Sequence, residues 1–207
     1  APMTLNRYLS SHSTPFGLTA LVFLLFFVSG MTGLVYEVVW TRMFTSVFGN
    51  TTYAISAVLA AFMGGLALGS FFIGRFIDNQ RKLLKLYALL EIGIGIMALC
   101  MPLLLNELNS LYALVFQNFT TSTGFLFLIK TVLSFFILLI PTFLMGGTLP
   151  LLSKYLIRHN DDIGAKVGLL YSINTLGATA GCFLTGFVFL EAFGISNTII
   201  IAAIVNL

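Results

Sequence analysis

A carboxylate lies between two aromatic residues in the first long apolar stretch of the sequence, where Tyr36, Glu37 and Trp40 are followed by Arg42. An ionised side chain is costly in hydrocarbon and marks a functional site by default. A carboxylate beside aromatic rings can hold an organic cation by charge and by cation–π attraction. We therefore predict a substrate-binding role for these four residues. The competing interpretation is an aromatic belt at the membrane interface, with Glu37 and Arg42 forming an ion pair.

Two further ionisable residues lie deeper in apolar stretches, Glu91 in the third and Lys130 in the fourth. We predict that both contribute to substrate binding, because charges in such surroundings are rarely accidental. The alternative for Lys130 is structural, since a lysine stem can extend its ammonium toward the interface. Pro141, with Gly146 and Gly147 after it, predicts a kink or break in the fourth stretch. Such breaks occur at transporter binding sites and also in ordinary membrane helices.

The sequence contains no motif typical of catalysis, metal binding or cofactor binding. Cys100 and Cys182 lie in apolar stretches, where cysteine acts as a small hydrophobe. A loose dinucleotide fingerprint at 93–98 does not follow a strand, so its glycines cannot hold a phosphate. No nucleophile, base and orienting group occur together. We expect no catalytic residue, metal site or cofactor in this chain, and the scattered basic residues predict no nucleic-acid partner.

The elements that carry these residues are apolar helices in a lipid bilayer. Hydrophobic residues make up 58% of the chain and charged residues 8%, with a mean hydropathy of +1.03, whereas a soluble domain carries roughly 25% charged residues. Strand-like alternation is absent, so the expected fold is all-α, a polytopic membrane helix bundle. We predict a polar segment at 1–15 and a transmembrane domain at 16–207. Its six spans are expected at about 16–39, 53–76, 86–105, 123–144, 167–190 and, incomplete, 196–207.

Basic residues gather near alternate ends of these stretches, which sets the expected orientation. By the positive-inside rule they mark the cytoplasmic side, so we predict a cytoplasmic amino terminus and a bacterial inner membrane location. The segment 106–122 is then an outer loop. The basic residues are Arg7 before the first stretch, Arg75, Arg81, Lys82 and Lys85 between the second and third, and Lys154, Arg158 and Lys166 between the fourth and fifth.

A weak internal repeat links the second and fifth stretches. Residues 65–74 (GLALGSFFIG) and 177–186 (GATAGCFLTG) share glycine at positions one, five and ten and phenylalanine at position seven. With three spans per unit, the two copies would cross the bilayer in opposite directions, as in the 3+3 inverted repeats of major-facilitator transporters. The alternative is two unrelated packing helices, whose glycines let neighbouring backbones approach closely.

The loop after the second stretch contains Arg75, Asp78 and Arg81. It resembles, one residue shorter, the loop between the second and third spans of major-facilitator proteins. That resemblance implies a cytoplasmic gate in which acidic and basic residues hold helix ends together. The plainer interpretation is a positive-inside loop with one aspartate.

Several longer blocks, in order, resemble the membrane domain of fused spermidine-synthase-like proteins. That family joins a major-facilitator-like helical half to a soluble aminopropyltransferase domain, which forms spermidine from putrescine. The resemblance covers about 30–190 and only the membrane half, so transferase activity would belong to sequence beyond residue 207 or to a partner. The blocks are Gly33–Arg42, Phe48–Ala54, Phe62–Ser70, Pro141–Pro150 and Gly168–Ala178.

The sequence leaves three functions open. The first is a membrane domain that anchors an aminopropyltransferase-type domain and binds or moves a polyamine or similar cation. The second is a structural subunit that packs against other membrane proteins, and the third is half of a major-facilitator-like transporter. Substrate identity, transport and oligomeric state do not follow from the residues.

Overall fold

The computed structural model describes residues 16–48, 51–118, 123–156 and 163–207, and this part of the chain is almost entirely helical. The predicted amino-terminal segment 1–15 lies outside the described residues. The elements are α2 (Phe16–Phe48), α3 (Thr51–Phe76), a 3₁₀ turn η1 (Ile77–Asn79), α4 (Leu83–Asn118), α5 (Thr123–Gly146), α6 (Thr148–Leu156), α7 (Ile163–Leu184), a π-helical turn η3 (Thr185–Phe189) and α8 (Leu190–Asn206).

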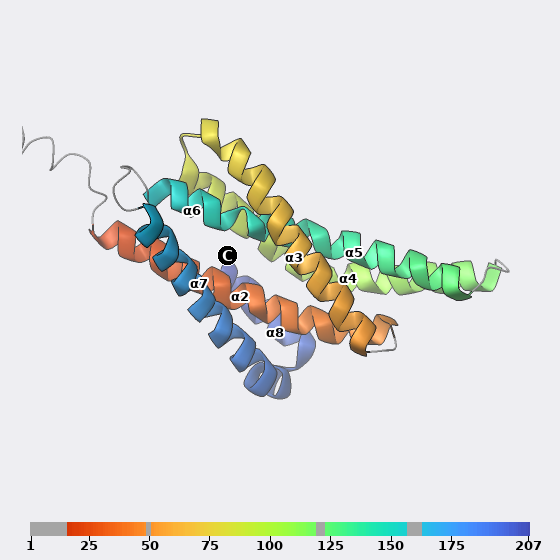
Figure 1. Cartoon of the computed structure of the whole chain (residues 1–207). Helices are drawn as coiled ribbons and strands as arrows, with labels where there is room; N and C mark the ends of the chain where they lie inside the picture. Colours follow the sequence, from red (N-terminus) through yellow and green to blue (C-terminus); the bar gives the residue numbers. More distant parts are fainter. Residues whose placement is uncertain (1–15, 49–50, 119–122, 157–162) are drawn as a thin grey trace, which may run out of the picture.

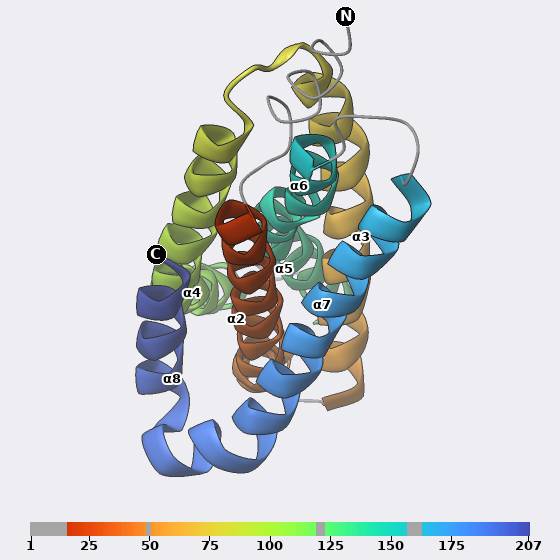
Figure 2. The same ribbon diagram turned by 90° about the vertical axis from the view of Figure 1, so that its left-hand side faces the viewer.

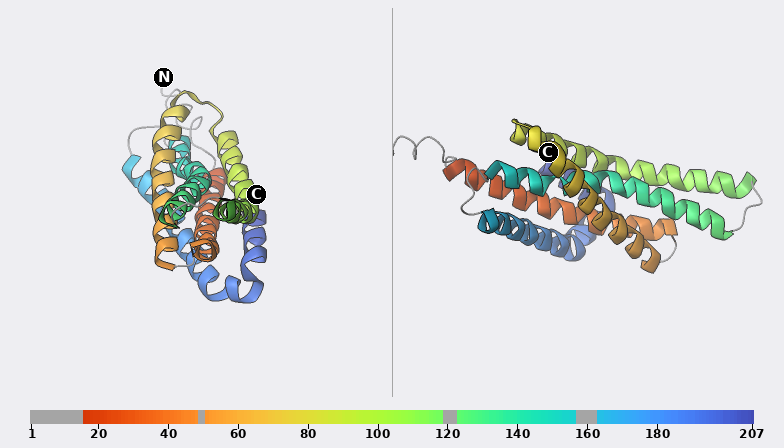
Figure 3. Two further views of the ribbon diagram at one scale, coloured as in Figure 1. Left: turned by 90° about the vertical axis from the view of Figure 1, so that its right-hand side faces the viewer. Right: turned by 45° about the horizontal axis from the view of Figure 1, so that its top comes forward.

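The long helices form an elongated bundle in which α2 lies between the others (Figures 1 and 2). The most extensive contacts join α2 to α7 and α3 to α5. Helix α4 packs on α5, and α8 lies along both α2 and α4. The view down the bundle in Figure 3 shows α8 beside α4 and on the opposite side of α2 from α3.

Glycines permit the two closest helix contacts. A methyl group on Gly177 or Gly181 of α7 would overlap the main-chain carbonyls of Phe27 or Met31 on α2. At the α3–α5 contact, a methyl group on Gly69 would likewise overlap the carbonyl of Phe143. Lipid supplies little hydrophobic drive for helix association, so such close backbone packing is a main source of stability. The predicted packing role of the glycine repeat is confirmed at these positions.

Within the described residues, five helical stretches are long and apolar enough to cross a membrane, so the predicted count of about six was wrong. The residues of the fifth and sixth predicted spans form one stretch, Ile163–Asn206, which turns back on itself at Gly194 (Figure 2). Gly194 has φ 71°, a conformation that glycine adopts without strain. This reversal coincides with the predicted separation of 167–190 from the incomplete span at 196–207.

Two predicted boundaries also differ from the structure. Helix α2 continues to Phe48, beyond the predicted end near residue 39, and α4 continues to Asn118, so most of the predicted 106–122 loop is helical. The break expected where Gly146 and Gly147 follow Pro141 occurs at Gly147, and α5 continues through the proline to Gly146. Polar residues on an amphiphilic helix end were mistaken for loop residues, since hydropathy marks where a helix leaves the lipid and not where it stops.

Candidate functional site

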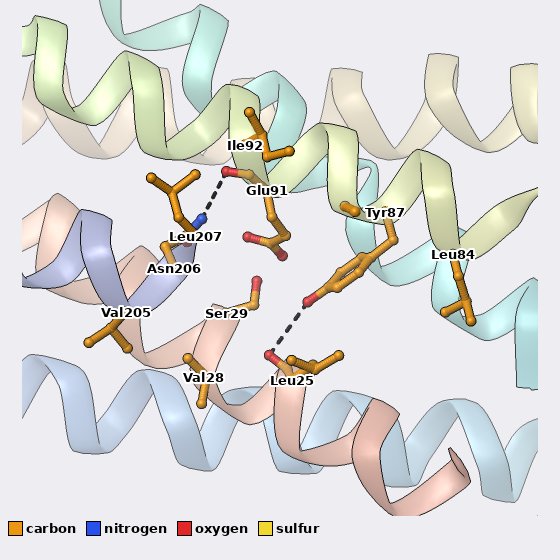
Figure 4. A pocket seen from close by; sticks show the side chains of 11 residues that line it. Leu25, Val28, Ser29, Leu84, Tyr87, Glu91, Ile92, Val205, Asn206 and Leu207 are labelled. Carbon is orange, nitrogen blue, oxygen red and sulfur yellow. Dashed lines mark hydrogen bonds between the residues drawn. The ribbon is translucent and has the colours of Figure 1, made fainter.

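Five polar side chains from three helices meet inside the bundle. Ser29 lies on α2, Tyr87 and Glu91 on α4, and Asn206 on α8 (Figure 4). Thr32, also on α2, contacts Asn206. Each pair on α2 and α4 is three or four residues apart, which places both members on one helix face. We call these five residues the Glu91 cluster.

Asn206 joins the three helices at this cluster. Its amide nitrogen donates a hydrogen bond to the main-chain oxygen of Glu91 over 2.8 Å, and its amide oxygen accepts one from the Thr32 hydroxyl over 2.9 Å. The Tyr87 hydroxyl donates to the main-chain oxygen of Leu25 on α2 over 3.4 Å. Interhelical hydrogen bonds of this kind hold membrane helices in a fixed register.

The Glu91 carboxylate is the most deeply buried acidic group in the described part of the chain, with 7% of the residue exposed. The side chains of Ser29, Tyr87 and Asn206 surround it within hydrogen-bonding reach. One of its oxygens, Oε1, is nevertheless buried without a hydrogen-bond partner among the described residues. A buried acceptor in this state is destabilising, which makes it a candidate receptor for a donor from outside the chain.

A cavity of about 280 Å³ opens beside this carboxylate. Figure 4 shows Glu91, Ser29 and Tyr87 pointing into the space between α2 and α4. The rest of the lining is mainly apolar, from Leu25, Val28, Leu84, Ile92 and Val205 among others. A few converging polar groups in an apolar wall are typical of small-molecule sites. The arrangement suits a small molecule with one hydrogen-bond-donating, cationic end and a hydrocarbon remainder.

The structure separates the predicted Tyr36–Glu37–Trp40–Arg42 group. Tyr36 and Trp40 stack with ring centroids 5.6 Å apart and are fully buried in the core. Glu37 and Arg42 instead line a second cavity, of about 440 Å³, together with Cys182 of α7. A turn of 100° per residue points neighbours in different directions, so sequence adjacency did not bring the carboxylate and the aromatic rings to one site.

The alternative prediction for Glu37, an ion pair with Arg42, is not met either. No ion pair links the two residues, although both are described and share one cavity. Lys130, on α5, is half-buried and lines none of the cavities described here. Of the six predicted binding residues, only Glu91 lies in the cluster.

The predicted gate residues have separate partners. Asp78 lies 3.8 Å from the ammonium of Lys154 on α6, which also donates a hydrogen bond to the main-chain oxygen of Ile77. The Arg75 guanidinium lies 5.0 Å from the centre of the Phe71 ring on its own helix. Arg81 lines a third cavity, between the start of α4 and α6. The aspartate thus connects the loop to α6 rather than to either predicted arginine.

Sequence reasoning missed four members of the cluster: Ser29, Thr32, Tyr87 and Asn206. The available signal was their spacing, because Ser29 and Thr32, and Tyr87 and Glu91, each recur at a helical interval within apolar stretches. Nothing local indicated that Asn206 reaches them. Within the described ranges, no three histidine, cysteine, aspartate or glutamate side chains lie close enough together to hold a metal ion.

The chain matches no protein-family model, and no curated protein or solved structure shows significant similarity to it. The resemblance to spermidine-synthase-like membrane domains therefore stays a prediction. The described part of the chain is all-helical, with five helical stretches long and apolar enough to cross a membrane, and its cluster geometry is the basis for assigning a function.

Proposed function

We propose that this protein is a membrane domain that binds an organic cation of the polyamine class in the cavity beside Glu91. The observation that carries the proposal is the buried Oε1 atom of Glu91, which has no partner among the described residues and belongs to a side chain that lines a cavity between α2, α4 and α8. An ammonium group supplies both the missing hydrogen bond and the opposite charge, and such charge-assisted hydrogen bonds are about twice as strong as neutral ones.

The rest of the cavity matches the rest of such a ligand. Ser29 and Tyr87 provide hydroxyl oxygens that can accept further N–H donors, and Leu25, Val28 and Ile92 provide an apolar wall for a methylene chain. The predicted resemblance points to the same chemical class. Under this proposal the domain also anchors an aminopropyltransferase-type domain or partner, and its amino terminus faces the cytoplasm of a bacterial inner membrane.

The helix contacts support the 3+3 inverted repeat as part of this proposal. If α2, α3 and α4 correspond to α5, α7 and α8, the contact of α3 with α5 corresponds to that of α7 with α2. The contact of α4 with α5 likewise corresponds to that of α8 with α2. Both members of each pair occur, and the repeated glycines Gly69 and Gly181 lie at the first pair. Such an arrangement is typical of transporter halves.

The test measures the thermal stability of the purified protein in lipid nanodiscs with and without spermidine or putrescine. Ligand binding to the folded state raises the midpoint temperature. We expect a rise with either amine, none with 1,4-butanediol, and binding weakened about tenfold to a hundredfold in Glu91→Gln. Gln keeps the side-chain shape and leaves the main-chain contact with Asn206 in place.

Glu37→Gln is the matched control, because it removes a carboxylate from the other face of α2. It should bind amines like the unchanged protein. If Glu91→Gln keeps full binding while Glu37→Gln loses it, the site is the second cavity and the original prediction for Glu37 is right. If amines stabilise none of the proteins, the binding proposal fails.

A structural subunit is the second candidate, and the outer face of α7 and η3 favours it. The contacts of α7 within the chain are mainly with α2. Leu176 and Phe183 of α7 and Phe187 of η3 are 59–70% exposed. Co-purification of a stoichiometric membrane partner, lost when these three residues are replaced by smaller ones, together with no amine response, would support this function.

A further inference from the structure

A strongly basic cavity lies where the residues just before α4 and the start of α4 meet α6. Its volume is about 400 Å³, and its charged lining consists of Arg81, Lys82, Lys85 and Lys154, with Tyr155 beside them. Arg81 and Lys82 lie just before α4, whereas Lys85 belongs to α4 and Lys154 to α6. The fold, and not the loop alone, therefore assembles the cavity. We call it the basic cavity.

Among the residues that the structure describes, acidic groups do not balance this charge. Asp78 is the carboxylate paired with Lys154, and it is 74% exposed, so water screens it. The first turn of α4 contains no acidic residue. Cations held around one space repel each other, and an anion placed between them would relieve that repulsion. Lys154 is fixed by its hydrogen bond to Ile77 and cannot simply turn away.

The main chain also favours an anion at the basic cavity. The first N–H groups of a helix have no acceptor within it and carry partial positive charge. Leu83 and Leu84, the first two residues of the 36-residue helix α4, line the basic cavity. A tetrahedral oxyanion could therefore accept bonds from both side chains and backbone, a combination common at phosphate sites.

We propose that the basic cavity binds the phosphate group of an anionic phospholipid. The cavity lies between the end of one membrane-spanning stretch, Thr52–Asn79, and the start of the next, Leu83–Leu111, at the level where headgroups meet water. Phe76 and Leu89, on the two helices that adjoin it, are 60% and 64% exposed, which offers apolar surface for acyl chains. Basic pockets between membrane helices on the cytoplasmic side bind such headgroups. The proposal is independent of the Glu91 cluster.

The experiment compares the full chain with two variants by native mass spectrometry and thermal stability in nanodiscs of phosphatidylglycerol or phosphatidylcholine. Lys82→Gln/Lys85→Gln removes two cavity charges without touching Lys154, whose contacts are structural. We expect phosphatidylglycerol to bind the unchanged protein and to bind the double variant roughly 25-fold more weakly, at about fivefold for each charge removed. Lys166→Gln, on α7 outside the cavity, is the single-charge control and should bind like the unchanged protein.

Each outcome decides the proposal. Selective loss in the double variant, with retention in Lys166→Gln and no binding of phosphatidylcholine, supports it. Binding that weakens in step with total charge removed, at either location, overturns it in favour of general attraction to an anionic surface. Stabilisation by inorganic phosphate alone to the same extent as by lipid would overturn the lipid assignment and leave a free-phosphate site. Circular dichroism of the double variant verifies that it is folded.

Discussion

Helix α2 has two faces that are built in opposite ways. Toward α7 the two backbones are so close that Gly177 and Gly181 leave no room for a side chain. Toward α4 and α8 apolar packing is combined with a few side-chain hydrogen bonds around the cavity beside Glu91. The first face fixes the position of α2 by shape, whereas the second leaves space that a ligand can occupy. Rigidity and binding capacity are thus separated on one helix.

The largest expected effect is on the close-packed face. Gly181→Leu forces a side chain against the backbone of Met31, which cannot move without displacing α2. Overpacking typically costs about 1–3 kcal/mol and more where backbone must shift, so we expect a large loss of monodisperse protein and a lower unfolding midpoint. Gly186→Leu, at a glycine with open space around it, should be close to neutral. Equal damage from both changes would contradict the proposed contrast.

An intermediate effect is expected where the polar face is joined by Asn206. Asn206→Ala removes the hydrogen bonds to Thr32 and to the Glu91 main chain. At roughly 0.6 kcal/mol for each such bond in a membrane, the free energy of unfolding should fall by about 1 kcal/mol, measured by chemical denaturation in mixed micelles. Asn106→Ala, on the exposed surface of α4, is the control and should change little. An unchanged stability would mean that α8 is held by packing alone.

The smallest effect is expected at Glu37. Its side chain is half-buried and forms no ion pair within the described residues, so Glu37→Gln should leave the free energy of unfolding within about 0.5 kcal/mol of the original. The same denaturation measurement tests this. A loss comparable with that of Asn206→Ala would show that the second cavity contributes to stability and would weaken the contrast between the two carboxylates.

The helical membrane fold was predictable because the requirement for satisfied backbone groups in lipid leaves few alternatives. The glycine contacts were also visible, since Gly177 and Gly181 are spaced by one helical turn. The reversal at Gly194 falls between the predicted spans 167–190 and 196–207, so a turn at this place was predictable, whereas the positive φ of Gly194 was not. Nor was the association of Asn206 with Glu91, which are distant in sequence and meet only after α8 folds back on α4.

The candidate site was partly predictable for a similar reason. Glu91 stands out in any hydropathy profile, so it was found, whereas Ser29 and Thr32 are common in membrane helices and gain meaning only from their neighbours. Tyr36 and Glu37 were grouped because they are adjacent in the sequence, but consecutive side chains of a helix point in different directions. The sequence identifies which residues are unusual in an apolar stretch. Only the packing of the helices determines which of these residues come into contact.

Asn206 also couples the binding of a ligand in the cavity beside Glu91 to the docking of α8, two processes that could otherwise be independent. Since its amide contacts both the main chain of Glu91 and the hydroxyl of Thr32, a cavity occupant that favours the docked position of α8 must bind more tightly when α8 is docked. The reciprocity is thermodynamic: α8 gains the same factor in docking that the ligand gains in affinity. A force or partner that pulled α8 away from α2 would therefore release the ligand, because the Asn206 side-chain amide links the position of α8 to the cavity.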